Sequence, residues 1–346
     1  MIRFNCDYSE GAHPRILEKL QQTNLTQTSG YGQDEYCQEA AALIRQACRA
    51  PQADVHFLVG GTQTNLTVIA AALRPYQGVI ASDTGHISLH ETGAIEATGH
   101  KVITLPNTDG KITAGQVKAF CAAHFEEDMP EYMVQPKMVY ISHPTEFGTL
   151  YTKRELEALR QACDQYNLYL FADGARLGYG LAAEGTDVTL ADMARLCDVF
   201  YIGGTKVGAL FGEAAVIVND ALKKDFRYMI KQTGAMLAKG RLLGLQFAEL
   251  FRDDLYLQIS KHADDMARII KDALQKAGLR LLYDTPTNQL FFALDKDTLH
   301  ALEKEYAFSH FGKTEDGLTL TRVCTSWATR EEDARALAAA LLQTAR

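Results

Sequence analysis

The ten residues VFYIGGTKVG (Val199–Gly208) join an apolar run to a lysine bracketed by glycines. Val199–Ile202 is predicted to be a buried strand, with Lys206 directly after its end. A lysine in that place is badly positioned for a solvated role, whereas burial lowers the pKa of an amine and makes it a usable nucleophile for a carbonyl carbon. Taken alone, the stretch fits an ordinary lysine in a turn equally well, so the two roles of Lys206 can be distinguished only with other parts of the sequence.

Short apolar runs alternate with amphipathic stretches around this segment. The runs predict strands at Val55–Val59, Val79–Ser82, Lys101–Leu105, Met138–Ser142, Leu168–Ala172, Val199–Ile202 and Ala214–Val218. Amphipathic stretches between them predict helices at Thr64–Leu73, Ala114–His124 and Lys153–Tyr166. Because several of the strands are apolar throughout and alternate with helices, the sequence indicates an α/β fold whose mostly parallel sheet is covered on both faces.

The pattern changes after Asn219. A long helical region, Arg241 to Ala277, appears only weakly broken. It is followed by predicted strands at Arg280–Tyr283, Gln289–Leu294 and Leu318–Val323 and a last helix at Arg330–Leu342. The chain has 346 residues, 47% of them apolar, which is too long for one simple core. We therefore expect a large domain over residues 16–240 and a smaller C-terminal α+β domain over residues 241–346.

A glycine-rich segment, Gly60–Asn65 (GGTQTN), directly follows the predicted strand Val55–Val59 and begins a helix. Glycines let the backbone approach a phosphate closely, and a helix N-terminus offers it unpaired N–H groups. A structural turn in which Thr62 caps the helix is an equally good interpretation of this segment alone.

Two further polar groups follow predicted strands. Asp173 stands at the end of Leu168–Ala172, where a carboxylate could keep a pyridinium nitrogen protonated or simply cap a helix. His86 follows Val79–Ser82, and its flat ring could stack on a flat cofactor, although a lone histidine is more often structural. Along the chain, the glycine-rich turn comes first, and His86, the Asp173–Arg176 motif and Lys206 follow in that order. Each of them comes after a predicted strand, which favours a cofactor site at one edge of the sheet.

With these motifs the chain resembles the threonine aldolase family, in the β-eliminating lyase group of fold-type-I pyridoxal-phosphate (PLP) enzymes. The resemblance covers nearly the whole chain and implies the aspartate-aminotransferase-like fold, with residues 1–15 as an arm that contributes to the active site. It is carried by Gly30–Asp34, Gly61–Asn65, Gly85–Ile87, Pro144–Thr149, Asp173–Arg176, Gly204–Lys206 and Arg322–Trp327.

The resemblance implies a role for each cofactor-binding residue. Lys206 would bind PLP covalently, Asp173 would pair with the pyridine nitrogen, and His86 would stack on the ring. Gly61 and Thr62 would hold the phosphate. The sixth residue expected at the cofactor is Arg176, near its phenolic oxygen.

The substrate side carries the departures from the family. Arg322 would bind the substrate carboxylate as a fork, and Tyr31 would reach a neighbouring subunit's site. The family's usual serine is replaced by Cys6, a weaker donor for which Ser9 could compensate. At the position where many members carry a second active-site histidine, this chain has Tyr132, which leaves open which group handles the substrate hydroxyl proton.

The reaction that these roles imply is cleavage of a β-hydroxy-α-amino acid, threonine or allo-threonine, into glycine and an aldehyde. His90, His86 or a held water are the candidate bases. Another PLP reaction, β-elimination or transamination, is the first alternative. A nucleotide-binding module without chemistry is a remote one, because Gly60–Asn65 lacks the G-x-G-x-x-G spacing and leaves Lys206 unexplained.

Composition limits the partners. The net charge is −8 with no basic run, so no nucleic-acid partner is expected, and no apolar run approaches membrane-spanning length. The seven cysteines are scattered without a CxxC pair, which predicts a reducing, cytoplasmic compartment and no metal site. The family resemblance implies a homo-oligomer, a dimer of dimers with shared active sites, acting on a small amino-acid substrate.

Overall fold

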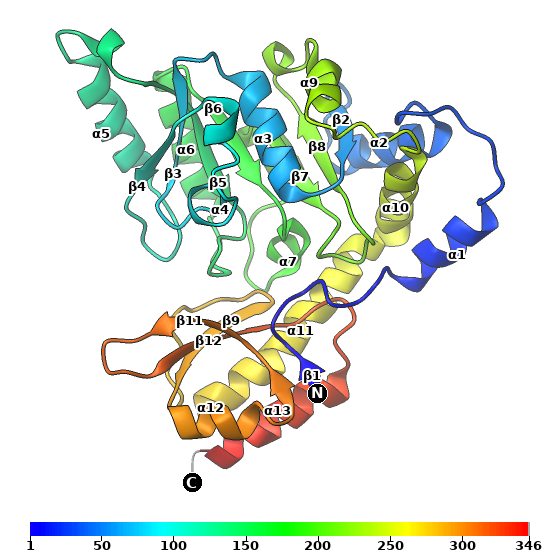
Figure 1. The fold of residues 1–346 in the computed structure, drawn as a ribbon, viewed down its shortest axis with the longest axis vertical. Coiled ribbons are helices and arrows are strands. Elements are labelled where there is room, and N and C mark those ends of the chain that lie inside the picture. The colour runs from blue at the N-terminus through cyan, green and yellow to red at the C-terminus, as the bar shows by residue number, and fades with distance from the viewer. Residues whose placement is uncertain (345–346) are drawn as a thin grey trace.

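A seven-stranded sheet forms the centre of the computed structural model, which describes residues 1–344 (Figure 1). Its strand order is β2-β8-β7-β6-β5-β3-β4. The bounds are β2 Asp54–Leu58, β3 Gln77–Ser82, β4 Val102–Leu105, β5 Gln135–Ser142, β6 Tyr169–Asp173, β7 Val199–Gly203 and β8 Glu213–Ile217. All seven predicted strands are therefore present, and the predicted mostly parallel α/β sheet is confirmed.

One strand of this sheet runs against the others. β8 is antiparallel to both of its neighbours, β2 and β7, while the remaining pairs are parallel. The carboxyl ends of the other strands therefore lie at the edge where β8 begins. Residues that follow those strands, and the first residue of β8, are brought to one side of the molecule.

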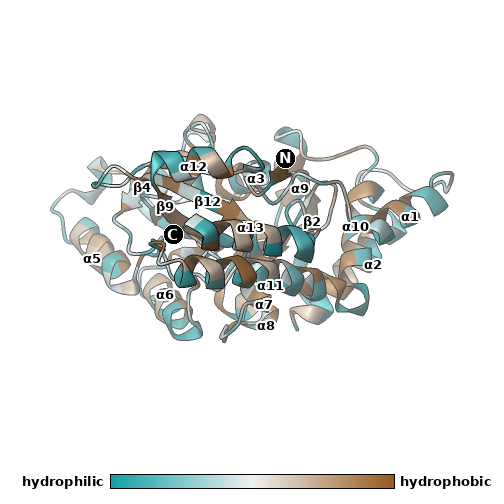
Figure 2. Cartoon of the chain, turned by 90° about the horizontal axis from the view of Figure 1, so that it is seen from below, coloured by the Kyte–Doolittle hydropathy of each residue, from teal (hydrophilic) through white to brown (hydrophobic). Residues whose placement is uncertain are grey.

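Both faces of the sheet are covered, which explains why its central strands are apolar throughout. In β6, Leu170 and Ala172 pack into the hydrophobic cluster of one face, whereas Phe171 packs into the cluster of the other. Figure 2 shows the resulting distribution, with brown segments inside and teal on outward parts of the helices. The helices of this part are α1 Pro14–Gln22, α2 Glu35–Ala47, α3 Gly61–Ala72, α4 His86–Leu89, α5 Ala114–Phe125, α6 Lys153–Gln165, α7 Leu177–Ala182, α8 Leu190–Leu196 and α9 Phe226–Gln232.

The long C-terminal helical region is two helices, which corrects the prediction of a weak interruption. α10 (Arg241–Phe251) and α11 (Leu255–Lys276) are separated by a sharp break. Asp253 and Asp254 take left-handed backbone angles there, with φ of 56° and 55°. α10 packs on α2, whereas α11 packs against α7 of the large domain and runs on to the small domain, where it packs against α13 (Glu331–Thr344) (Figure 1). The domain boundary expected at residue 241 stays a prediction.

The small domain holds a three-stranded antiparallel sheet, β11-β12-β9, formed by Ser309–Lys313, Thr319–Cys324 and Gln289–Leu294. The N-terminal strand β1 (Ile2–Arg3) pairs with β10 (Tyr306–Ala307) of the small domain in a separate two-stranded sheet. Helix α12 spans Lys296–Leu302. The strand predicted at Arg280–Tyr283 is wrong, because that segment bends away from β9 after one bridge between Leu281 and Phe292. The last two residues of the predicted domain 241–346 lie outside the described ones.

Within residues 1–344, no helix is both long enough and apolar enough to span a bilayer.

Candidate active site

The strand ends surround one pocket with a volume of about 280 Å³. Its lining includes six of the predicted site residues: Gly61, Thr62, His86, Asp173, Arg176 and Lys206. They lie at or after the carboxyl ends of β2, β3, β6 and β7, so the shared direction of these strands brings together segments that are far apart in the sequence. The other five predicted residues are not among the lining within residues 1–344: Cys6, Ser9, Tyr31, His90 and Arg322.

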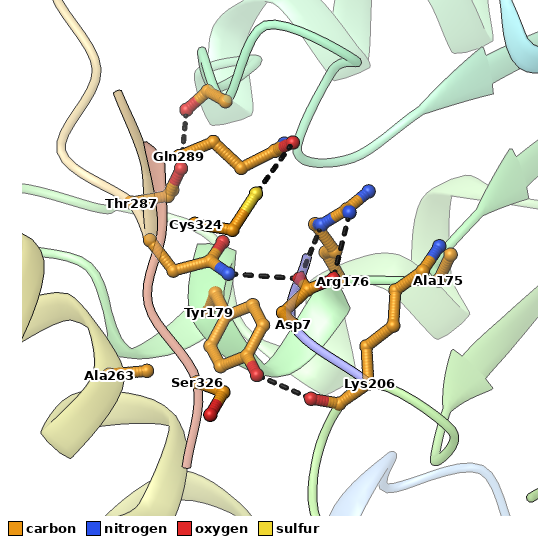
Figure 3. Close-up of polar contacts among 12 residues, drawn as sticks. Asp7, Ala175, Arg176, Tyr179, Lys206, Ala263, Thr287, Gln289, Cys324 and Ser326 are labelled. Carbon is orange, nitrogen blue, oxygen red and sulfur yellow. Dashed lines mark hydrogen bonds and ion pairs between the residues drawn. The ribbon is translucent and has the colours of Figure 1, made fainter. Parts of the chain in front are cut away.

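Lys206 lies in the loop after β7, with its amine directed toward Ala175 (Figure 3). Its backbone carbonyl accepts a hydrogen bond from the Tyr179 hydroxyl. The end of β7 lies so close to the loop after β6 that it requires a glycine, because a Cβ at Gly203 would lie 2.3 Å from the carbonyl oxygen of Ala175. Burial and the charge of Arg176 lower the pKa of Lys206, which enlarges the neutral fraction that can attack a carbonyl.

Asp173 ends β6 and is almost fully buried. Its Oδ1 accepts hydrogen bonds from the Tyr201 hydroxyl and, at 2.9 Å, from the N–H of Ala175. Its Oδ2 accepts from the Tyr140 hydroxyl and, at 3.0 Å, from the side-chain amide of Asn65. Burial alone would raise the pKa of Asp173, but a nearby histidine and the tyrosine hydrogen bonds lower it overall. The carboxylate is therefore ionised at neutral pH and suited to a protonated ring nitrogen.

Helix α3 begins at the pocket with an open N-terminus. Its N-cap is Gly60, and no side chain in residues 1–344 caps the helix. Thr62 lies within the first turn, so the alternative in which Thr62 caps the helix is wrong. A Cβ at Gly61 would lie 3.0 Å from the Tyr201 hydroxyl, so the glycine keeps this wall clear. The free N–H groups and the helix dipole suit an anion such as a phosphate.

A buried carboxylate orients His86. The Nδ1 of His86 lies 2.7 Å from Oε1 of Glu91, whose side chain is fully buried. The same oxygen accepts a hydrogen bond from the amide of Asn65 at 2.7 Å, and Asn65 also donates to Asp173. One network therefore fixes both the ring that is expected to stack on the cofactor and the carboxylate expected at its nitrogen.

The guanidinium of Arg176 is occupied by the N-terminal arm (Figure 3). Its Nε and Nη2 donate to the two oxygens of Asp7 at 2.7 and 2.9 Å. Asn288 of the small domain also donates to Asp7, at 2.9 Å. Arg176 thus borders the pocket while its fork holds the arm and the small domain together.

Arg322 lies on β12 outside the pocket lining. Its Nη1 donates to the side chain of Gln289 at 3.3 Å, and Nη2 donates to the backbone carbonyl of Asn5 at 3.1 Å. Its guanidinium also lies 4.9 Å from the centre of the Phe311 ring. Its role as a carboxylate-binding fork stays a prediction.

The remaining predicted residues lie around the pocket or away from it. His90 is exposed, 5.6 Å from His86 between ring centres. The Cys6 sulfur and Ser9 hydroxyl are 3.2 Å apart on the arm. Tyr31 is 48% exposed on another face, where Lys231 lies 5.0 Å from the centre of its ring.

Tyr132 is not among the residues of positions 1–344 that line the pocket of its own chain. It precedes β5, at the amino end of that strand, and is 79% exposed. The pocket lies at the carboxyl end of the same strand, so within this chain Tyr132 is on the opposite edge of the sheet. The correspondence of Tyr132 to a second active-site histidine stays a prediction.

Comparisons with known proteins agree with this geometry. A family model described as β-eliminating lyase matches residues 10–297. The solved structure of a threonine aldolase from Leishmania major is 47% identical, covers 100% of both chains and has a TM-score of 0.97.

The chain belongs to the β-eliminating lyase family, among the threonine aldolases.

Two other comparisons extend this result. The low-specificity L-threonine aldolase of Pseudomonas aeruginosa is 29% identical over 97% of this chain and 96% of its own length. An aspartate aminotransferase structure from Thermus thermophilus has a TM-score of 0.73 at 16% identity, covering 99% of this chain and 91% of the other. The second likeness confirms the expected aspartate-aminotransferase-like fold alone.

The cofactor of this β-eliminating lyase is PLP, and the residues at the pocket fit it. An amine with a lowered pKa suits the aldehyde carbon, an ionised carboxylate suits the ring nitrogen, and an uncapped helix start suits the phosphate. The fit depends on Gly61 in particular, because a side chain there would meet the Tyr201 hydroxyl.

Several residues of this site were not predicted. Asn65 stands inside the segment Gly60–Asn65 and Glu91 lies five residues after His86, but only the fold shows that the two side chains meet. Glu213 starts β8, lines the pocket and accepts a hydrogen bond from the N–H of Gly204 at 3.1 Å. Burial raises the pKa of Glu213, while Lys206 lowers it. Glu146 and Tyr8 line the same pocket.

Proposed function

We propose that this lyase cleaves a β-hydroxy-α-amino acid, threonine or allo-threonine, into glycine and an aldehyde. The observation that carries the proposal is the full-length likeness, at 47% identity, to a threonine aldolase structure. The pocket supports it, since Lys206 and Asp173 face the same space.

The cofactor side of the proposal assigns six residues. Lys206 binds the cofactor covalently, Asp173 holds the proton on the ring nitrogen, and His86 stacks on the ring under the control of Glu91. The start of α3 at Gly61 and Thr62, with Arg176 beside the pocket, completes the cofactor set. When bound, PLP supplies an electron sink that accepts the electron pair of a broken bond at Cα.

The substrate side is assigned by charge and position. Arg322 binds the substrate carboxylate, which requires its guanidinium to exchange one of its present contacts, such as Gln289, for that group. Cys6 and Ser9 on the arm assist, and His90 lies at the rim. Removal of the β-hydroxyl proton needs a base in addition to these groups.

The test is an assay of the PLP-loaded protein with the four threonine stereoisomers. Release of glycine and acetaldehyde in equal amounts from at least one isomer is expected. Ammonia with a keto acid would instead indicate β-elimination, and a keto acid with the amino group left on the cofactor would indicate transamination. No turnover and no bound cofactor would favour the remote alternative of a non-catalytic nucleotide-binding module.

Assembly and compartment belong to the same proposal. We propose a homo-oligomer, a dimer of dimers, in which Tyr31 reaches the pocket of a neighbouring copy; its exposed ring and its absence from the pocket lining of its own chain within residues 1–344 support this. Sedimentation of the loaded protein tests the number of copies. All seven cysteines lie in the described part of the chain and are free, which supports a cytoplasmic location.

A further inference from the structure

One carboxylate at the pocket has no role in the proposal so far. Glu146 lies in the loop that follows β5 and lines the pocket together with Lys206, Asp173 and His86. β5 is a parallel strand of the central sheet, so its following loop reaches the same edge as the loops after β3, β6 and β7. A carboxylate in that place faces the space where substrate would be.

The two oxygens of this carboxylate differ. Oε1 accepts hydrogen bonds from the N–H of His86 at 2.8 Å and from the Ser142 hydroxyl at 2.6 Å. In the described part of the chain, Oε2 takes part in no hydrogen bond, and it is not among the buried atoms without a partner. One oxygen is thus anchored, and the other is accessible to a molecule in the pocket.

The loop that carries Glu146 is fixed by contacts of the two residues that follow it. The hydroxyls of Thr285 and Thr287 donate to the carbonyl of Gly148 at 2.7 and 2.9 Å. The ring of Phe147 stacks on Tyr283 with 4.2 Å between centres. The carboxylate is therefore held by contacts to the small domain as well as by its own hydrogen bonds, as a group acting on substrate must be.

Cleavage of a β-hydroxy amino acid requires a base for the hydroxyl proton, and the two histidines expected for this task are less well placed. His86 has its Nδ1 committed to Glu91, and its ring is assigned to the face of the cofactor. His90 is exposed and outside the pocket lining of residues 1–344. Burial raises the pKa of Glu146, which makes its carboxylate a stronger base than an exposed one.

We propose that Glu146 is the catalytic base that removes the β-hydroxyl proton of the substrate, with Ser142 holding the carboxylate in position. The inference rests on the proposed function, since only a β-hydroxy substrate offers this proton. The hydroxyl proton passes to Oε2 of Glu146, and the oxygen's electron pair forms the C=O bond of the aldehyde. The Cα–Cβ bond breaks, its electron pair stays on the glycine half, and a proton taken up at Cα completes glycine.

The variant Glu146→Gln tests this assignment. A glutamine keeps an oxygen that can accept from His86 and Ser142, but it is not a base. The rate of threonine cleavage by the loaded variant is expected to fall by about 10²- to 10⁴-fold. Exchange of the α-proton of glycine in deuterated water, followed by NMR, is expected to stay within about twofold of wild type, because glycine has no β-hydroxyl.

Two further measurements separate catalysis from structure. PLP affinity, measured by fluorescence titration of the cofactor-free protein, is expected to be unchanged in Glu146→Gln, whereas a structural role in holding the His86 segment would weaken it. Glu315→Gln, the same substitution at an exposed position outside the pocket lining, is the matched control and should cleave threonine at the wild-type rate.

The outcomes distinguish the two levels of the proposal. A wild type that exchanges glycine but cleaves none of the four threonine isomers would overturn the proposed function and this assignment with it. A wild type that cleaves threonine while Glu146→Gln cleaves equally fast would overturn the assignment of Glu146 alone. Equal losses of cleavage, glycine exchange and PLP affinity in the variant would also overturn it, and would make Glu146 a positioning residue.

Discussion

At the scale of single residues, the pocket depends on one amine with a lowered pKa. Lys206 is surrounded by the carboxylates Asp7, Asp173 and Glu213, which favour its charged form, and by Arg176 and burial, which oppose it. The balance leaves the pKa of Lys206 below its ordinary value of 10.5. A lysine with this environment is suited to bind a carbonyl compound, which a fully exposed lysine at neutral pH does far less readily.

Lys206→Ala is therefore expected to abolish covalent cofactor binding and to stop threonine cleavage. Borohydride reduction followed by peptide mass spectrometry should find the PLP adduct on Lys206 in the wild type and on no residue in the variant. Lys223→Ala is a suitable control, because Lys223 lies away from the pocket and donates to Asp220 and to the carbonyl of Gln52. An adduct that persists elsewhere in Lys206→Ala, with turnover retained, would refute the assignment.

At the scale of elements, the break between α10 and α11 is made by backbone conformation. Asp254 is exposed and has a φ of 55°, a region that Asp tolerates and that β-branched residues do not. Asp254→Val is expected to lower the free energy of unfolding by about 1–2 kcal/mol. In Asp254→Gly the free energy of unfolding should fall much less, because glycine adopts this conformation freely. Urea unfolding of the two variants measures the difference. Equal stability of both would show that the break has no conformational cost.

The elements also show what the sequence can and cannot predict. All seven sheet strands were predictable, because burial on both faces leaves a continuous apolar run such as Val199–Ile202. The reversed direction of β8 was not predictable, since an apolar run gives no information on the direction of the strand in the sheet. The pairing of Asn65 with Glu91, and of Glu146 with His86 and Ser142, depends on how loops from different strands meet. Composition and local spacing carry no information on such contacts.

At the scale of the whole molecule, Asp7 links three parts of the chain. It receives two hydrogen bonds from Arg176 of the large domain and one from Asn288 of the small domain. Burial alone would raise the pKa of Asp7, but Arg176 and Lys206 lower it below its ordinary value of 3.8. The ion pair therefore contributes its full stability above about pH 4 and loses it as the pH falls through the lowered pKa.

Asp7→Asn is expected to lower the free energy of unfolding at pH 7 by about 3–5 kcal/mol, because it leaves Arg176 without a counter-charge in a mostly buried site. The difference from wild type should be smaller at pH 3, where the unfolded wild type is largely protonated at this residue. Urea unfolding at both pH values measures it. Asp272→Asn, an exposed site with the same change of charge, is the control. A difference independent of pH would contradict the ion-pair explanation.

The position of Asp7 also bears on how the protein is made. During synthesis Asp7 precedes its two partners, because Arg176 comes 169 positions later and Asn288 comes 281 positions later. In the same way, β1 precedes its partner β10 by about three hundred positions. The arm must therefore stay undocked until the segment that carries Asn288 has emerged from the ribosome, and only then can Asp7 link the two domains beside the pocket.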